Sequence, residues 1–353
     1  MSFELESGEG VGAGIRRIVD EQLGDALDEL RQENPRKVDE AVHSARKRLK
    51  RVRAVARLVR GELGDGVFER ENVAFRDAGR TLSEARDAAV LVQTLDSLRR
   101  RANGQLFAAA RKALAARRRA VHRRVIEQGN GLEGVAQAVE EARQRVSDWS
   151  IDRDGWRALR PGLRRIYGDG RRGFKLARGG AREEVFHEWR KQVKHLWHQL
   201  EIVEPVWPEL IKALGDECHD LADLLGEEHD LAVLREVLAT EAPTSVAADS
   251  PVLEAIQEKR ADLQQRALSL GARVYAEKPK AFVRRMGKYW RAWQEQKAAQ
   301  PQEQPVEEST PPAAAPEAAP APAQAERVGT QQSAGSDGSA LATSEAAPNN
   351  GAH

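Results

Sequence analysis

Apolar residues recur at spacings of three and four along nearly every segment of the chain up to residue 297. At this spacing, apolar side chains lie on one face of a helix. The same segments are rich in Ala, Leu, Arg and Glu and lack the apolar–polar alternation that is typical of strands. Because these residue types also favour helices intrinsically, the pattern predicts an all-α fold.

Clusters of glycine and proline interrupt this periodicity and predict where the helices end. They lie near residues 35, 64, 103, 130, 154, 180, 206, 243 and 279. The intervals between them predict roughly ten helices, several of them longer than about twenty residues. Residues 1–14 are a short, Gly-rich segment, and we expect them to form a flexible leader.

From Ala298 onward the composition changes to Pro, Ala, Gln, Glu and Ser, with no aromatic residue. Such a segment cannot bury a core, so residues 298–353 are predicted to be a disordered, acidic tail. A solvated spacer is the favoured interpretation, and a short partner-binding motif is the alternative. The tail holds seven acids and one base, a net charge of −6, and since the whole chain carries +1, the rest carries +7. A basic body indicates polyanionic partners.

Cys218 is the only cysteine, which excludes a disulfide framework or a thiolate zinc cluster within one chain. This cysteine usage fits a reducing compartment. The first residues lack the features of a signal peptide, and no apolar run approaches the length of about 18 residues that a membrane span needs. We therefore expect a soluble, cytoplasmic protein without membrane insertion.

Two composite motifs occur twice, in the same order. The pattern H-x-x-R-K-x-x-K begins at His43 and again at His187, while "LSEARDAAVL" at 82–91 matches "LGEEHDLAVL" at 225–234. The separation from the first histidine to the aspartate of the second motif is 44 residues in one copy and 43 in the other. This recurrence predicts a tandem duplication, with halves at about 15–147 and 152–297 packed into one unit.

Helical phase separates cations from apolar residues in both copies of the first motif. In the first copy one face holds His43, Arg46, Lys47, Lys50, Arg53 and Arg57. The opposite face holds Ala45, Leu49, Val52, Ala56 and Val59. In the second copy His187, Arg190, Lys191, Lys194 and His198 share a face. They oppose Trp189, Val193, Leu196, Leu200 and Val203. Both helices are thus predicted to bury one stripe and present a basic one.

A solvated surface is the commonest role of a basic helix face, and it is the alternative to a binding site here. Between His43 and Arg60, however, there is no acidic residue to offset the repulsion of like charges. The duplication of such a face favours a ligand that supplies negative charge. Three further basic segments, at 111–124, 159–175 and 278–291, are expected to extend the two stripes into a long positive groove or channel.

The histidines raise the alternative of a metal site, since five of them lie in the second repeat half, at about 152–297. They are His187, His195, His198, His219 and His229. No HExxH pattern is present, and cationic surroundings disfavour a divalent metal, so neither a metal nor a cofactor is predicted. In a phosphate groove, His43 and His187 can instead donate hydrogen bonds to an anionic oxygen.

Asp87 and Asp230 occupy matching positions in the second motif. A structural ion pair that orients the groove cations is the role expected for both. Arg86 and His229, the residues that precede them, are open between the same supporting role and direct contact with the ligand.

The two motifs together resemble the CHAD domain, the conserved histidine α-helical domain, over about residues 15–295. The resemblance implies two pseudo-symmetric four-helix bundles around a basic surface, binding of inorganic polyphosphate, and localisation to polyphosphate granules. It assigns polyphosphate contact to His43, Arg46, Lys47, Lys50, Arg51, Arg53, His187, Arg190, Lys191 and Lys194. By position, the second copy has His195 and Trp197 where the first has Arg51 and Arg53, which predicts weaker binding by that half or a shift of its contacts to His198.

CHAD domains often follow a CYTH triphosphatase barrel, whose first strand carries a Glu-x-Glu-x-Lys pattern. In "FELESGE" Glu4 and Glu6 match, but Gly8 replaces the lysine and the helical pattern begins almost at once. We therefore expect a CHAD domain without a CYTH domain.

Non-enzymatic binding of polyphosphate in the cytoplasm, in association with polyphosphate granules, is the leading functional hypothesis. Nucleic-acid binding by the same basic groove is the first alternative, although no recognition motif is present and aromatic residues are sparse. An enzyme acting on phosphoanhydrides is the second alternative, although the chain lacks a P-loop and an evident pair of metal-binding carboxylates. The sequence leaves the oligomeric state open.

Overall fold

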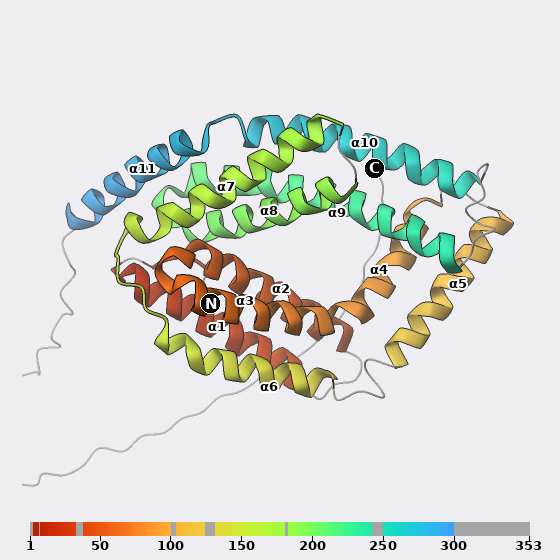
Figure 1. Ribbon diagram of the computed structural model, residues 1–353, viewed down its shortest axis with the longest axis horizontal. Coiled ribbons are helices and arrows are strands. Elements are labelled where there is room, and N and C mark those ends of the chain that lie inside the picture. Colours follow the sequence, from red (N-terminus) through yellow and green to blue (C-terminus); the bar gives the residue numbers. More distant parts are fainter. Residues whose placement is uncertain are drawn as a thin grey trace, which may run out of the picture. The chain divides into compact units, whose positions relative to one another are not determined.

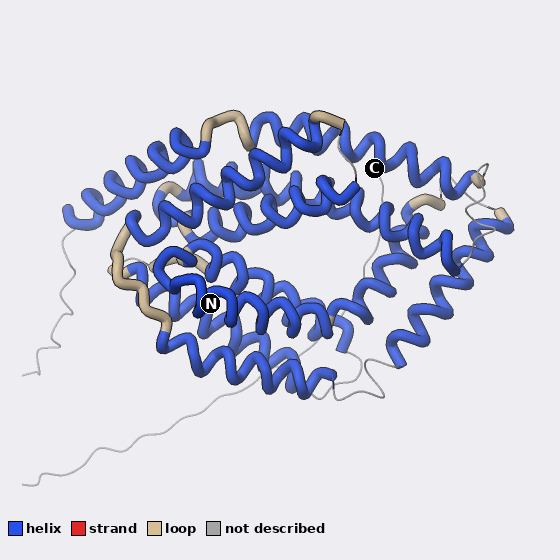
Figure 2. Tube along the Cα trace, viewed as in Figure 1, coloured by secondary structure: helices blue, strands red, loops and turns tan. Residues whose placement is uncertain are grey.

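The computed structural model describes residues 3–6, 8–32, 38–99, 104–123, 131–180, 183–241 and 250–299. Over these residues the chain consists of eleven α-helices and two short 3-10 turns, without any strand (Figure 2). The predicted all-α fold is therefore confirmed. Nearly all of the predicted tail lies outside the described residues, but Ala298 and Ala299 are the last residues of a helix.

Four helices of the first half form a bundle in which each helix packs against the next (Figure 1). They are α1 (Val11–Arg31), α2 (Val38–Leu58), α3 (Arg60–Thr81) and α6 (Gly131–Gln144). A 3-10 turn at Arg145–Asp148 ends the last of them.

A second four-helix bundle has the same pattern of neighbours, with its last helix returning to its first. It consists of α7 (Trp156–Arg178), α8 (Glu183–Ile202), α9 (Pro208–Glu241) and α10 (Pro251–Val274). A 3-10 turn at Glu204–Val206 joins two of these, and α11 (Pro279–Ala299) lies along α7 (Figure 1). The derivation of the two bundles from a duplication stays a prediction.

The two bundles meet along α2 and α8 and again through two helices that leave the first bundle. These are α4 (Ser83–Ser97) and α5 (Gln105–His122), which reach α9. A separate apolar core, which includes Leu95, Leu114, Leu234 and Ile256, joins them to the second bundle. The second motif of each half is carried by α4 and α9, so this contact brings both copies of it together.

The main core confirms the helical phase predicted for the two basic helices. All ten residues assigned to the apolar stripes are 0–1% exposed. They are Ala45, Leu49, Val52, Ala56, Val59, Trp189, Val193, Leu196, Leu200 and Val203. Burial of such side chains stabilises the fold by about 1.5–3 kcal/mol for each large one, so it anchors the two helices and turns their basic faces outward. Among the described helices, none is both long and apolar enough to cross a membrane.

Two helix boundaries differ from the prediction. The break expected near residue 64 is a kink inside α3, where Gly64 has φ +73°, while the chain leaves α2 earlier, at Val59. Glycine takes this left-handed conformation without the steric cost of a Cβ atom. The boundary at Leu82 was not predicted, because no glycine or proline marks it.

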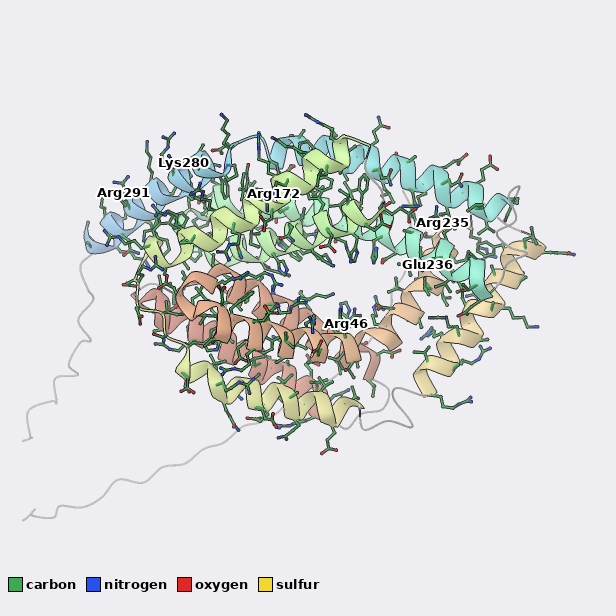
Figure 3. All side chains as sticks on the ribbon, viewed as in Figure 1. Arg46, Arg172, Arg235, Glu236, Lys280 and Arg291 are labelled. Atoms are coloured by element: carbon green, nitrogen blue, oxygen red, sulfur yellow. The ribbon has the colours of Figure 1, made fainter. Side chains whose placement is uncertain are left out.

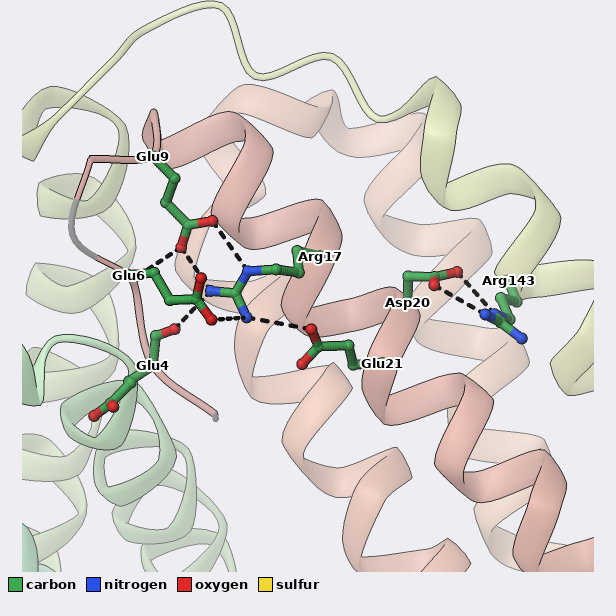
Figure 4. A network of polar contacts seen from close by, with 7 residues as sticks. All are labelled: Glu4, Glu6, Glu9, Arg17, Asp20, Glu21 and Arg143. Atoms are coloured by element: carbon green, nitrogen blue, oxygen red, sulfur yellow. Dashed lines mark hydrogen bonds and ion pairs between the residues drawn. The ribbon is translucent and has the colours of Figure 1, made fainter. Parts of the chain in front are cut away.

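Residues 3–6 and 8–14 differ from the predicted flexible leader, because α1 already begins at Val11 and described residues before it pack on the bundles. Phe3 and Leu5 are buried, and the Leu5 amide donates to the Ile202 carbonyl at 3.0 Å. Figure 4 shows Arg17 donating to the Glu9 carboxylate and to the Glu4 carbonyl, at 2.6 Å and 2.9 Å. Charge-assisted hydrogen bonds of this kind tie the N-terminal segment to α1.

Candidate anion-binding site

The contact between α2 and α8 places matching residues of the sequence repeat opposite one another. The buried side chain of Gln199 donates to the Ala54 carbonyl at 3.1 Å, which fixes the register of the two helices. Arg46 lies within electrostatic range of Arg190, and Lys50 within range of Lys194. Because these pairs occur in the same order along both helices, α2 and α8 run in the same direction.

Arg46, Lys50, Arg190 and Lys194 form what we call the basic cluster. Each of the two lysines is repelled by both arginines. Lys50, Arg190 and Lys194 have no carboxylate within ion-pairing distance among the residues that the structure describes. Two helices thus bring four like charges together, with Asp87, Asp223 and Asp230 acting on them from α4 and α9.

Lys50 shows how the protein surrounds this cluster. Its side chain is exposed to water. Even so, burial lowers the pKa of its ammonium to about 7, and repulsion by Arg46 and Lys194 adds to this effect. Burial also lowers the pKa of Lys194 to about 8. The exposed side chain and the lowered pKa are compatible, because water reaches the Lys50 amine from one direction while protein encloses it on the others.

The two arginines of the cluster carry unsatisfied donors. Arg46 donates through Nη2 to Asp87 at 3.3 Å, but its buried Nε has no hydrogen-bond partner among the described residues. The buried Nε of Arg190 also lacks a partner there. The Arg190 guanidinium lies against Gly226 of α9, where Nη2 would be 3.5 Å from an added Cβ atom. Both Nε atoms are closed to solvent, so an anion that binds these arginines contacts their other guanidinium nitrogens.

The second motif converges on the same place. Asp87 on α4 accepts from Arg46, and Arg86 lies within electrostatic range of Arg46 and His43. Burial raises the pKa of Asp230 on α9, while Arg190 opposes that shift. No ion pair of Asp230 occurs within the described part of the chain. The four motif segments, about 140 residues apart in pairs, therefore meet around the basic cluster.

The histidines of this region are held largely uncharged. His187 and His229 lie with their Nδ1 atoms 3.2 Å apart, a contact in which one ring donates and the other accepts. Burial lowers the pKa of His229 to about 4, and His187 repels it further. Burial likewise lowers the pKa of His187 and, together with Arg86, that of exposed His43. At neutral pH these rings can offer a hydrogen bond, but little positive charge.

The CHAD domain family model matches residues 21–239, which is more than half of the chain and includes all four motif segments. This protein belongs to the CHAD domain family. A solved structure, PptA from Streptomyces chartreusis, has a similar fold, with a TM-score of 0.51 and 14% sequence identity. That similarity covers 76% of this chain and 98% of PptA, and at this identity it shows the fold alone. No curated protein matches the chain.

Two residues assigned to polyphosphate contact lie away from the basic cluster of this CHAD domain. Arg51 donates to Glu201 at 2.9 Å and stacks its guanidinium over Phe3. His198 is 3% exposed, and its Nδ1 lies 2.6 Å from Glu201. Both side chains are thus occupied by the contact between the N-terminal segment, α2 and α8. The assignment of Arg51 and His198 to ligand contact stays a prediction: Arg51, like Arg46, is a partly exposed guanidinium with one carboxylate partner, while His198 is almost closed to solvent.

The remaining predicted cations lie on either side of the cluster. Lys47 and Lys191 are exposed, and Lys191 is paired with Glu188 of its own helix at 2.6 Å. Arg53 and Arg57 lie further along α2 beside α3, where Arg53 donates to Asn72 at 3.4 Å.

His195 of the CHAD domain faces these two arginines and was missed as a candidate. Burial and the charges of Arg57 and Arg53 lower the pKa of His195 well below its ordinary value, and its Nδ1 has no partner among the described residues. The only signal for it in the sequence is its place one residue after Lys194.

The three additional basic segments do not extend the α2 and α8 stripes as predicted. Within α5, Arg111, Arg117 and Arg118 each pair with an acid, so part of the charge of that segment is neutralised. The segments at 159–175 and 278–291 lie on α7 and α11, where they line a pocket of their own. Helical packing explains the difference, since α7 turns its apolar face to the second bundle and its basic face away from it. Among the described residues, no group of three His, Cys, Asp or Glu side chains could hold a metal ion.

Proposed function

We propose that this CHAD protein binds inorganic polyphosphate at the basic cluster and does so without catalysing a reaction. The observation that carries this proposal is the meeting of four cations on α2 and α8 with only Asp87 as an ion-pair partner among the described residues. Their mutual repulsion would be relieved by anionic oxygens, which bind lysine and arginine through charge-assisted hydrogen bonds. CHAD domains are linked with polyphosphate binding in general, and association of this protein with polyphosphate granules is part of the proposal.

A linear phosphate chain fits the cluster better than a single phosphate ion does. Arg46 and Lys50, like Arg190 and Lys194, are one helical turn apart, so each helix presents cations at steps of about 6 Å. The two rows run in the same direction, and exposed Lys47 and His43 continue one of them. Arginine forks can take two oxygens each, while lysines follow the chain as mobile point charges.

A titration of the full-length protein tests this function against nucleic-acid binding. We expect tighter binding to long-chain polyphosphate than to single-stranded DNA with the same number of phosphates, because the cluster offers charge without exposed aromatic rings. The affinity should fall steeply from low to near-physiological salt, as counterion release requires. Equal affinity for DNA, or release of orthophosphate in the presence of Mg²⁺ or Mn²⁺, would contradict the proposal.

Polyphosphate binding is expected to strengthen as the pH falls from about 8.5 to about 6, by roughly tenfold. With pKa values of about 7 and about 8, Lys50 and Lys194 are mostly neutral at the upper pH and charged at the lower one. A bound anion favours their charged forms, so binding takes up protons and weakens as pH rises. Isothermal titration calorimetry across this range measures the effect.

The variant Lys50→Arg with Lys194→Arg is the matched control for this pH dependence. Arginine keeps the charge but does not titrate in this range, so its pH profile should be much flatter than that of the parent. Identical pH profiles for the parent and this variant would show that the two lysines are not the titrating groups.

A further inference from the structure

A pocket of about 1180 Å³ lies between α7 and α11, on residues that the proposed function does not use. Six of the cations that line it indicate an anionic ligand: Arg157, Arg160, Arg164, Lys280, Arg284 and Arg291. Figure 3 labels Lys280 and Arg291 on α11 and shows Arg46 of the basic cluster on the other bundle. None of the pocket residues belongs to α2 or α8. Part of the wall is α11, which begins at Pro279 and lies beyond the segment matched by the CHAD family model.

The six cations of this pocket lack ion-pair partners within the described part of the chain, since none has a carboxylate within ion-pairing distance there. Nearby cations are paired: Arg153 contacts Glu62 at 2.9 Å, and Arg285, the neighbour of Arg284, donates to Glu277 at 2.9 Å. Elsewhere on α7, Arg172 is paired with Asp169. The pocket thus gathers six unpaired cations in one place, although other cations of the two helices, such as Arg165 and Lys288, also lack an ion pair among the described residues.

The three acids of the pocket wall form no ion pair with these cations, and each hydrogen-bonds to another group. Glu9 is bound by Arg17 on α1 at 2.6 Å. Asp154 accepts from the Val11 amide at 2.9 Å and so caps the start of α1, where the helix dipole also favours a negative charge. Asp152 accepts from Ser150 at 2.6 Å.

The cations form two facing rows. Arg157, Arg160 and Arg164 share one face of α7 at spacings of three and four, because the opposite face buries Leu159 and Leu163. On α11, which runs in the opposite direction, Lys280 lies beyond the middle of α7 and Arg291 near its start.

The basic surface also continues along α7 beyond this pocket. A smaller recess lined by Arg164, Arg165 and Arg172 extends it. From Arg157 to Arg172 the helix advances by about 22 Å, which is long enough for an extended ligand.

We propose that the α7–α11 pocket is a second binding site for an extended phosphate chain, separate from the basic cluster. The proposal takes its ligand class from the proposed function. Phosphate is favoured over nucleic acid because the pocket tryptophans are packed on each other rather than open to a base. Trp290 is 6% exposed, its ring centroid lies 6.1 Å from that of Trp156 and 5.1 Å from that of Trp293. What the pocket offers is therefore unpaired charge on two rigid helices.

Calorimetric stoichiometry with a short linear polyphosphate, too short to span both sites, tests the proposal on the full-length protein. The parent should bind two chains per protein molecule. The variant Arg157→Glu, Arg160→Glu, Arg284→Glu should keep one, at the basic cluster, and the variant Lys50→Glu, Lys194→Glu should keep the other. For long-chain polyphosphate, loss of the α7–α11 pocket should weaken binding by about tenfold or more, because two linked sites bind one chain with avidity.

The control carries the same change of charge on exposed cations outside both sites, at Lys112, Arg119 and Arg266, and should still bind two short chains. Circular dichroism verifies folding, and glutamine replaces glutamate at the three arginines if the reversed variant does not fold. Two chains still bound by the pocket variant would overturn this inference and leave the basic cluster intact as a site. The inference would also be overturned if the pocket variant lost binding of single-stranded DNA alone, because the pocket would then be a nucleic-acid site.

The outcomes also separate this inference from the proposed function. In one outcome, the parent binds a single polyphosphate chain that the pocket variant no longer binds and the basic-cluster variant still binds. That result would uphold the α7–α11 pocket as a site and reject the basic cluster. No binding by the parent would reject both.

Discussion

A full-length variant with Lys50→Glu and Lys194→Glu is expected to bind long-chain polyphosphate at least about 100-fold more weakly than the parent at the same ionic strength. Hydrogen bonds to charged groups contribute about 1.5–3 kcal/mol each, and reversal adds repulsion to their loss. The two side chains face one another across α2 and α8, so both changes act on the same stretch of ligand. Fluorescence anisotropy with labelled polyphosphate measures the affinity.

Reversal of Lys112 and Lys212 to glutamate is the matched control, since it changes the net charge equally at two exposed lysines outside the cluster. This control should lose only a few-fold in affinity, through the general field of the protein. Far-ultraviolet circular dichroism should be unchanged in both variants, because neither lysine of the cluster lies in the core. Equal losses in the variant and its control would mean that net charge, and not the basic cluster, holds the ligand.

Arg260→Met is expected to lower the free energy of unfolding by about 3–5 kcal/mol. Arg260 and Glu228 are 7% and 2% exposed, and Arg260 donates to Glu228 through Nη2 at 2.7 Å and through Nε at 3.1 Å. It also binds Glu183 of α8 at 2.6 Å, so this ion pair joins three helices of the second bundle. Without the guanidinium, the Glu228 carboxylate stays buried, and among the described residues Gln264 is its one remaining hydrogen-bond donor. Urea denaturation followed by circular dichroism measures the loss.

Two further variants separate a buried unpaired charge from a simple loss of packing. Adding Glu228→Gln to Arg260→Met should restore about half of the lost stability or more, because the second change removes the uncompensated charge. Arg266→Met, in the same helix, breaks an exposed pair with Asp262 and should change stability by less than about 1 kcal/mol. A double variant less stable than Arg260→Met alone would contradict the electrostatic explanation.

The position of this ion pair links stability to the site. Glu228 directly precedes His229 and Asp230 in the second motif, and Gly226, two residues earlier, makes room for Arg190. The motif at 225–234 therefore has residues on two faces of α9: one is anchored to α10 by Arg260, and the other meets the basic cluster. Periodicity alone indicates a mid-helix segment here, but it does not show which neighbour each face meets.

The amino-acid sequence by itself determined the helical class and the orientation of α2 and α8. Three- and four-residue spacing is a local property, and burial of Leu49, Val52 and Trp189 follows from it directly. The sequence also identified Arg46, Lys50, Arg190 and Lys194 as residues of one kind of surface, because the repeated motif places them in equivalent phase. The glycine content of the leader indicates flexibility, but it does not show that Phe3 and Leu5 are buried beside α8.

Only the tertiary structure decided which basic faces meet. Arg51 lies within about 80° of the cationic face by helical phase, yet Glu201 from another helix takes its charge, and the same carboxylate binds His198. The cations of α7 and α11 were expected beside α2 and α8, but they form a separate pocket because packing turns their helices the other way. Helical phase shows which residues share a face, whereas the partner of that face depends on contacts between residues far apart in the chain, and no local pattern encodes those contacts.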